Sequence, residues 1–295
     1  MALPLAAALA IGLILQGGIA AAQEASSRPA ASAEPPSQAD GVDPSLSPEC
    51  RVPGSKLYTL ASLRRVKRAL RDHRTLKVLA IGSSSTLGGG SFSPAASYPA
   101  RLEDELERLT PGVDVEMINR GLSGEIAGGA AERLKNTIAG VEPDLVVWQV
   151  GTNDALARVD AETFSESLDE TLKWLQAHKI DVVLVDPQYT ASLADDASYK
   201  DIVRVIEDVA RRNRVPLVHR YDATRYLAEH RERARLLRNQ FQLNDLGYRC
   251  MAEHVARAVT VSLLQPEPLQ PEPPADPPAA RKPPSAEPAA SPPGP

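Results

Sequence analysis

Short apolar runs alternate with helical segments from residue 76 to residue 264, and this alternation limits the fold more than any other feature of the chain. The runs are almost entirely apolar, and the first, Leu76–Ile81, ends directly at a glycine. Apolar strands separated by helices indicate a parallel sheet covered by helices on both faces. We therefore predict an α/β fold, a three-layer α/β/α sandwich around a parallel five-stranded sheet. The expected strands are residues 76–81, 113–118, 145–150, 182–185 and 215–219, and the expected helices are residues 98–109, 130–138, 161–179, 202–213 and 246–264.

Proline content separates this region from the rest of the chain. Half of the 26 prolines lie beyond Leu264, in a tail without aromatic residues or apolar periodicity. Such a segment buries too little surface to offset its chain entropy, so we expect residues 265–295 to form a disordered or polyproline-like extension. Residues 23–48 have a similar composition and are expected to be a disordered linker. One domain, residues 49–264, remains.

Residues 1–22 are expected to form a cleaved signal peptide, which would export the protein to the periplasm or the exterior. The apolar run is broken by Gln16 and two glycines, whereas a membrane-spanning helix needs about 20 consecutive apolar residues. Ala20, Ala21 and Ala22 supply the small residues of a cleavage site. No Lys or Arg precedes the apolar run, which is unusual for a signal peptide, so an uncleaved anchor is the alternative.

The two cysteines, Cys50 and Cys250, lie at opposite ends of the expected domain. Export would place them in an oxidising compartment, where paired thiols tend to form disulfides. We expect a disulfide between them, which would close a loop of about 200 residues. Two unrelated buried thiols are the alternative.

Charge and composition give few signs of other ligands. The formal net charge is −5, and the two basic clusters, residues 64–74 and 211–214, lie on expected helices, where a solvated face is the ordinary explanation. Nothing indicates nucleic-acid binding, and no cluster has metal-ligand spacing. No feature calls for an organic cofactor, and none indicates the oligomeric state.

The segment after the first strand, Gly82-Ser83-Ser84-Ser85-Thr86, is the first candidate for chemistry. It lacks the Gly-Lys-Ser/Thr ending and the G-x-G-x-x-G spacing of nucleotide-binding loops. A serine at a tight strand exit exposes its hydroxyl and suits a nucleophile. Taken alone, the cluster is more often a turn or a helix cap.

Two further loops favour the nucleophile. Asn119 and Ser123-Gly124 follow the second strand, and Gly151-Thr152-Asn153-Asp154 follows the third. With the serine segment, these blocks resemble those of the SGNH, or GDSL-type, hydrolases, with Ser83 in place of the usual Asp. The resemblance covers residues 76–256 and implies a flavodoxin-like sandwich with Ser84 as nucleophile.

The resemblance also implies an oxyanion hole. Its donors would be the Ser84 and Gly124 backbone amides and the Asn153 side chain. Donors fixed around a developing oxyanion are worth about 3–4 kcal/mol each in acyl transfer. Ser83, Ser85, Thr86 and Asp154 would support the site or contact the ligand.

The fourth family block departs from the pattern. It normally reads Asp-x-x-His before the last helix, but the matching positions hold Asn239 and Gln242. Gln cannot accept the serine proton at a useful pH, and Asn cannot stabilise an imidazolium. The near-isosteric exchange of both partners fits a hydrogen-bonded shape that is kept while the chemistry is removed.

Other residues at the strand ends could contribute. His219 ends the fifth strand and is a candidate replacement base, while Asp186 and Asp222 could shape the pocket or bind a polar ligand. We expect Asp154 to brace its loop. The remaining histidines, at positions 73, 178, 230 and 254, are expected at the surface.

Two functions are consistent with these features. One is an ester hydrolase that removes acyl groups from a small substrate, an extracytoplasmic saccharide or lipid, with weakened activity. The other is a catalytically inactive relative that binds an acylated or glycan ligand in the same pocket.

Overall fold

A computed structural model describes residues 41–230, 235–239 and 241–267 of the chain. The predicted signal peptide, most of the linker and nearly all of the tail lie outside the described residues. Among the described residues, no helix is both long and apolar enough to span a membrane.

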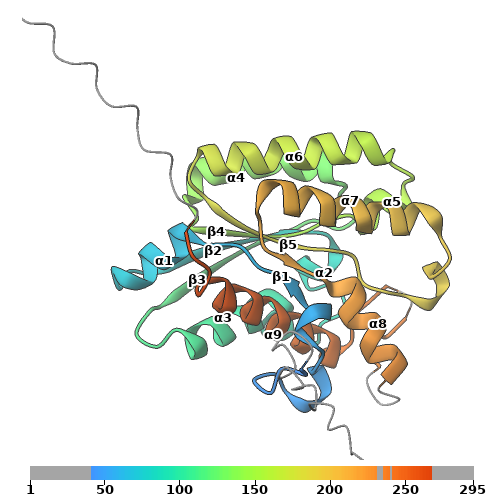
Figure 1. Cartoon of the computed structure of the whole chain (residues 1–295), viewed down its shortest axis with the longest axis horizontal. Coiled ribbons are helices and arrows are strands. Elements are labelled where there is room, and N and C mark those ends of the chain that lie inside the picture. Colours follow the sequence, from blue (N-terminus) through green and yellow to red (C-terminus); the bar gives the residue numbers. More distant parts are fainter. Residues whose placement is uncertain (1–40, 231–234, 240, 268–295) are drawn as a thin grey trace, which may run out of the picture. The chain divides into compact units, whose positions relative to one another are not determined.

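A single mixed sheet forms the centre of the domain (Figure 1). Its strands run in the order β1-β6-β5-β4-β2-β3, and all neighbours are parallel except β1 and β6. The five predicted strands are present, but the sheet has a sixth, the two-residue antiparallel edge strand β1, which is too short to give a readable sequence pattern. The strands are β1 (Tyr58–Thr59), β2 (Leu76–Gly82), β3 (Val115–Gly121), β4 (Leu145–Gln149), β5 (Asp181–Val185) and β6 (Leu217–Val218).

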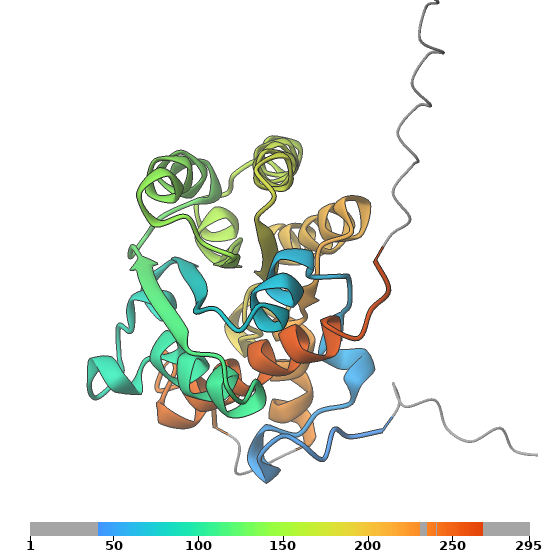
Figure 2. The same ribbon diagram turned by 90° about the vertical axis from the view of Figure 1, so that its left-hand side faces the viewer.

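Helices cover both faces of this sheet, as predicted (Figures 1 and 2). One apolar core lies between the sheet and α4 (Ala127–Val141), α6 (Ala161–Ala177) and α7 (Ala197–Asn213). The other lies between the sheet and α1 (Arg64–Arg71), α3 (Tyr98–Leu109) and α9 (Asp245–Ser262). The result is a three-layer α/β/α sandwich.

Caps explain where the helices begin. Asp160 accepts hydrogen bonds from the Glu162 and Thr163 amides, which confirms it as the N-cap of α6. Helix α7 starts five residues before its predicted start because Asp196 caps it through the Tyr199 amide at 2.9 Å. The apolar pattern used for the prediction begins only at Ile202.

Three helices were not predicted in their own right. Helices α2 (Ser84–Leu87) and α5 (Thr152–Leu156) each form a single short turn at a strand exit. Helix α8 (Arg220–His230) is rich in charged residues and buries only four side chains, so it lacks a clear apolar stripe. Single turns of 3₁₀-helix occupy Pro48–Cys50, Gly54–Lys56, Pro94–Ala96 and Ala191–Leu193.

The first described residues pack against the last helix. Cys50 and Cys250 form a disulfide, with 5.1 Å between their Cα atoms. His254 was expected at the surface, but it is 3% exposed, and its Nε2–H donates to the Cys50 carbonyl at 2.7 Å. Residues 41–48 were assigned to the linker from their composition, yet Leu46 is buried and Asp43 pairs with Arg257 at 2.5 Å.

Candidate active site

Sheet topology brings the serine segment and the Asn153 loop to the same place. The five parallel strands follow the order β3-β2-β4-β5-β6, which reverses direction between β2 and β4. Ligands of such sheets bind at this switch point, beyond the carboxyl ends of the strands. Ser84 follows β2 and Asn153 follows β4, so both lie at the switch point.

A sharp turn exposes Ser84. Gly82 has φ +152°, and a Cβ there would lie 2.5 Å from the Thr86 Oγ1 and 2.8 Å from the Gln149 carbonyl oxygen, so only glycine fits. The chain then enters α2 with Ser84 as its first residue. Ser84 is half-buried, and its hydroxyl makes no hydrogen bond to any described residue. The side chain of Ser83, the N-cap residue, makes no capping hydrogen bond, so Ser83 does not cap α2 through its hydroxyl.

The residues around Ser84 are fixed by buried contacts. Thr86 is fully buried and donates to the Gln149 Oε1 at 3.1 Å, and Ser83 and Ser85 are also buried. Asn119 donates through Nδ2 to the Thr86 carbonyl at 2.8 Å and accepts from the Gly121 amide at 2.9 Å. These contacts hold the loop after β3 against the serine turn.

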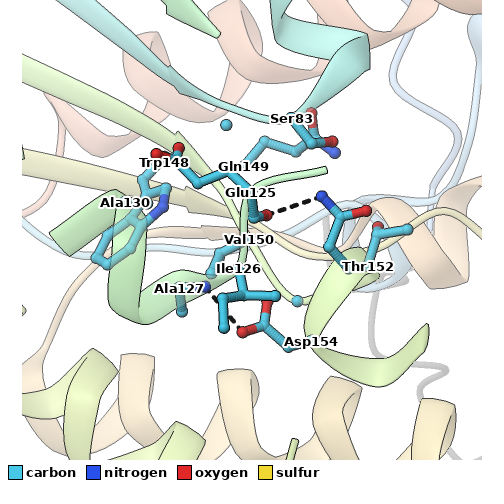
Figure 3. A pocket seen from close by; sticks show the side chains of 13 residues that line it. Ser83, Glu125, Ile126, Ala127, Ala130, Trp148, Gln149, Val150, Thr152 and Asp154 are labelled. Atoms are coloured by element: carbon cyan, nitrogen blue, oxygen red, sulfur yellow. Dashed lines mark hydrogen bonds between the residues drawn. The ribbon is translucent and has the colours of Figure 1, made fainter. Parts of the chain in front are cut away.

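Gly124 and Asn153 lie on two loops that are hydrogen-bonded to each other. The Asn153 Nδ2 donates to the Glu125 carbonyl at 2.8 Å. Gly124 has φ +79°, is exposed, and has open space where a Cβ would stand. A cavity of about 10 Å³ lies among these loops and is lined by Gly82, Ser83 and Asn153 (Figure 3). That volume suits about one water molecule.

Asp154 connects the Asn153 loop to helix α4. Its Oδ1 accepts the Ala127 amide at 2.8 Å, as Figure 3 shows, and its side chain is 2% exposed. Burial raises the pKa of this carboxyl, while the backbone amide hydrogen bonds oppose the shift. The geometry is that of a residue that braces a loop.

Asn239 and Gln242 are hydrogen-bonded to each other in one turn before α9. The Asn239 Nδ2 donates to the Gln242 Oε1 at 3.0 Å, and the Asn239 Oδ1 accepts the Gln242 amide at 2.9 Å. The buried Gln188, beyond the end of β5, holds this turn by donating to the Phe241 carbonyl at 2.8 Å. The side chains of Asn239 and Gln242 are both exposed.

This turn lies beside the serine segment. A Cβ on Gly90 would stand 3.7 Å from the Gln242 Cβ, and one on Gly89 would stand 3.6 Å from the Ser84 Cβ. The Tyr248 hydroxyl, on α9, donates to the Gly89 carbonyl at 2.8 Å. Ser84 and Gln242 therefore lie on either side of a two-glycine segment.

His219 and Asp186 follow β6 and β5, on the opposite side of β4 from the strand β2 that leads to Ser84. The His219 Nε2 is 2.7 Å from the Thr59 Oγ1 on β1, and burial lowers the pKa of its imidazole. Three strand spacings separate β6 from β2, about 14 Å, so His219 is poorly placed to act as base for Ser84. Asp186 accepts the Tyr221 amide at 2.8 Å, and its complete burial raises the pKa of its carboxyl well above the usual value.

One feature of the site was not predicted from the sequence. The structure describes seven large apolar side chains as exposed, and five of them lie on the loops and short helices that follow β2, β3 and β4. These residues have no visible period in the sequence, and the sheet topology brings their loops to the carboxyl ends of neighbouring strands. We call them the apolar rim: Leu87, Phe92, Leu122, Ile126 and Leu156, between 38% and 78% exposed.

Known proteins of similar fold are esterases and related hydrolases. A two-domain esterase active on acetylated mannans, crystallised with mannopentaose, is 21% identical with a TM-score of 0.61, over 74% of this chain and 59% of that one. An alpha/beta hydrolase from the metagenome of Lake Arreo, Spain, is 25% identical with a TM-score of 0.53, over 65% of this chain and 98% of that one.

Sequence comparisons agree with the fold. An arylesterase of Vibrio mimicus is 31% identical over 124 residues, which are 40% of this chain. The match spans about three fifths of that curated relative, 60% of its length. The sequence profile of the Non-GDSL lipase-like family matches residues 49–264. The chain thus belongs to the Non-GDSL lipase-like family, within the SGNH/GDSL-like hydrolases.

Proposed function

We propose that this protein is a slow ester hydrolase that uses Ser84 as its nucleophile. The observation that carries the proposal is the Ser84 hydroxyl, which is half-buried and without a described partner at the switch point of the sheet. A structural serine in a tight turn normally bonds to nearby backbone. The buried contacts around Ser84 keep its position fixed while leaving its oxygen available.

The proposed reaction has two steps. The Ser84 Oγ attacks the ester carbonyl carbon and loses its proton to water, and the alkoxide leaves as the alcohol after taking a proton from water. Water then attacks the acyl-serine, releasing the acid and restoring the hydroxyl. The oxyanion is stabilised by the amides of Ser84 and Gly124 and by the Asn153 side chain. Ser84 is the first residue of α2, so its amide has no acceptor within the helix.

The rate is limited because Asn239 and Gln242 replace the acid–base pair. Neither amide accepts a proton at neutral pH, so the serine proton must pass to solvent. In serine hydrolases without the triad, the oxyanion hole and binding still leave about 10³–10⁴-fold catalysis over water. We therefore expect this protein to accelerate ester hydrolysis by about 10³–10⁴-fold over the reaction in water.

The apolar rim supports a substrate with an apolar acyl or aryl portion. Its five exposed side chains lie on the same loops as Ser84, Gly124 and Asn153. Because they lie at the same strand ends as the candidate nucleophile, we infer that they contact the apolar part of a substrate. The Vibrio mimicus relative is an arylesterase and the two-domain structural neighbour is active on acetylated mannans, so an acylated saccharide or lipid outside the cytoplasm is the proposed substrate class.

A second candidate is non-catalytic binding of an acylated or glycan ligand. It is favoured by the hydrogen bond between Asn239 and Gln242, which keeps these two side chains paired without any basic group. In that case Ser84 and Asn153 would serve as hydrogen-bonding groups for the ligand.

Turnover of p-nitrophenyl acetate and p-nitrophenyl octanoate by the purified protein separates these candidates. We expect slow, saturable hydrolysis with a higher kcat/KM for the octanoate, lost in Ser84→Ala. His219→Ala is the control and should retain the full rate. Hydrolysis that survives Ser84→Ala, or none with either ester, would reject the proposal and leave the binding role.

A further inference from the structure

A basic groove lies at the amino ends of the parallel strands, at the opposite end of the strands from the candidate active site. It has a volume of about 890 Å³ and is lined by α1, by the ends of α6 and α7, and by the start of β5. Ile180 and Asp181 place it at the amino ends of the strands, whereas Ser84 follows a carboxyl end. The two sites therefore lie at opposite ends of the parallel strands.

The groove concentrates positive charge on a chain whose net charge is −5. Eight of its lining residues are Arg or Lys, against two acidic ones, Asp181 and Glu267. Asp181 is engaged at the N-terminus of α1, where it accepts the amides of Arg65 and Val66 at 2.7 and 3.0 Å. The groove is therefore suited to an anionic occupant.

Four of these cations have no acidic partner within the described residues: Lys67, Arg68, Lys179 and Arg214. Lys179 and Arg214 follow directly on the ends of α6 and α7, where cations are favoured by the helix dipoles. The helix dipoles explain where Lys179 and Arg214 lie, but within the described residues neither side chain pairs with a carboxylate. Arg68, Lys179 and Arg214 are exposed along the groove.

The chain itself already enters the groove. Gln265, Pro266 and Glu267 are part of its lining, and the Lys67 Nζ donates to the Gln265 carbonyl at 2.5 Å. Glu267 lies 3.9 Å from the Arg64 Nε. The first tail residues thus bind through the two chemistries that the groove offers, donation to a backbone carbonyl and pairing with a carboxylate.

We propose that the basic groove is the docking site of the chain's own proline-rich tail, residues 268–276. This segment continues directly from Glu267 and carries Glu272 and Asp276, while its first basic residues, Arg281 and Lys282, come later. Extended at about 3.1 Å per residue, its nine residues reach about 28 Å.

Two physical properties favour the tail over a separate ligand. Proline-rich segments in the polyproline conformation form no internal hydrogen bonds, so their carbonyls remain free to accept from Lys and Arg. Because the tail is tethered inside the groove, its effective concentration there is high and little further ordering is needed. Docking at this end of the strands leaves Ser84 uncovered.

Photo-crosslinking within the full-length protein tests this directly. A p-benzoylphenylalanine is placed at Leu269 or Ala275, and cross-linked peptides are identified by mass spectrometry. We expect intramolecular cross-links to the α1 segment and to residues 179–181 and 211–215. The combined variant Arg68→Glu, Lys179→Glu and Arg214→Glu should reduce their yield at least fivefold.

A matched variant controls for net charge. Arg108→Glu, Lys135→Glu and Lys200→Glu reverse three exposed cations outside the groove and should leave the cross-links unchanged. Cross-links elsewhere in the chain, or an equal yield in the two reversed proteins, would overturn the proposal. So would cross-links mainly between two molecules, which would assign the groove to a second copy of the chain.

Discussion

The side chains around Ser84 preserve an arrangement whose reactive pair is absent. Asn119, Asp154 and Thr86 each make a buried or half-buried hydrogen bond that fixes a loop. Asn239 and Gln242 keep a hydrogen bond to each other, but neither supplies a base. The site therefore lacks only the acid–base pair at positions 239 and 242, while the hydrogen bonds that fix its loops are all present.

His254 gives the molecule a pH-dependent weakness. It is completely buried, and burial lowers the pKa of its imidazole to about 4 from the usual 6.5. The unfolded chain then binds a proton at a higher pH than the folded chain does. The stability from a neutral His254 is therefore complete above about pH 6.5 and is lost as the pH falls towards 4, on the order of 3 kcal/mol in total.

His254→Gln tests this point, since Gln can still donate to the Cys50 carbonyl. Urea unfolding from pH 7 to pH 4 should show the variant losing less stability than the natural protein as the pH falls. Parallel stability curves for the two proteins would contradict the expectation.

Individual elements were predicted well where they had long apolar patterns. Helix α3 has the predicted bounds, and the five parallel strands occur in the predicted places. Strands β2, β4, β5 and β6 are almost entirely buried apolar runs, whereas the edge strand β3 is only partly buried and follows an alternating pattern. Strand β1 and helices α2 and α5 were missed because two to five residues carry no periodicity. His254 was misplaced because α9 is buried on nearly all sides, which a helical pattern alone does not reveal.

Close packing between β3 and α2 should make Gly121 irreplaceable. A Cβ at this position would overlap the backbone nitrogen of Leu87, within the helix that begins at Ser84. Gly121→Ala should destabilise the protein by about 1–3 kcal/mol and also lower esterase turnover, because the serine turn must shift.

Gly140→Ala is the matched control, since nothing lies within 4 Å of a Cβ there. It lies in α4 and should be neutral or stabilising by up to about 1 kcal/mol. Thermal unfolding of both variants gives the comparison, and equal melting temperatures would count against the proposed contact.

The disulfide ties the beginning of the domain to its last helix. Cys50 and Cys250 are 200 residues apart, so the bond restricts the conformations open to nearly the whole domain when it is unfolded. Chain-entropy arguments put the stabilisation at about 5 kcal/mol. The double variant Cys50→Ala, Cys250→Ala should therefore unfold at a much lower urea concentration than the natural protein.

Reductant provides the control for this prediction. It should lower the urea midpoint of the natural protein towards that of the double variant and leave the variant unchanged. A natural protein whose midpoint is insensitive to reductant would show that the bond contributes little.

At the level of the whole domain, the sequence predicted the fold class and the order of the site blocks, because three of the blocks lie at strand ends and the fourth directly precedes the last helix. It did not predict the apolar rim or the basic groove. Both are assembled from segments far apart in the chain, such as α1, the ends of α6 and α7, and the first tail residues. Only the sheet topology brings such segments together.

The central claim is that this domain retains a formed hydrolase site whose acid–base pair has become Asn239 and Gln242. Restoring the pair in the protein, with Asn239→Asp and Gln242→His together, tests it most directly. We predict that p-nitrophenyl acetate hydrolysis rises at least a hundredfold over the natural protein and is abolished again by adding Ser84→Ala. A folded double variant with no gain in turnover, or a gain that persists without Ser84, would contradict the claim.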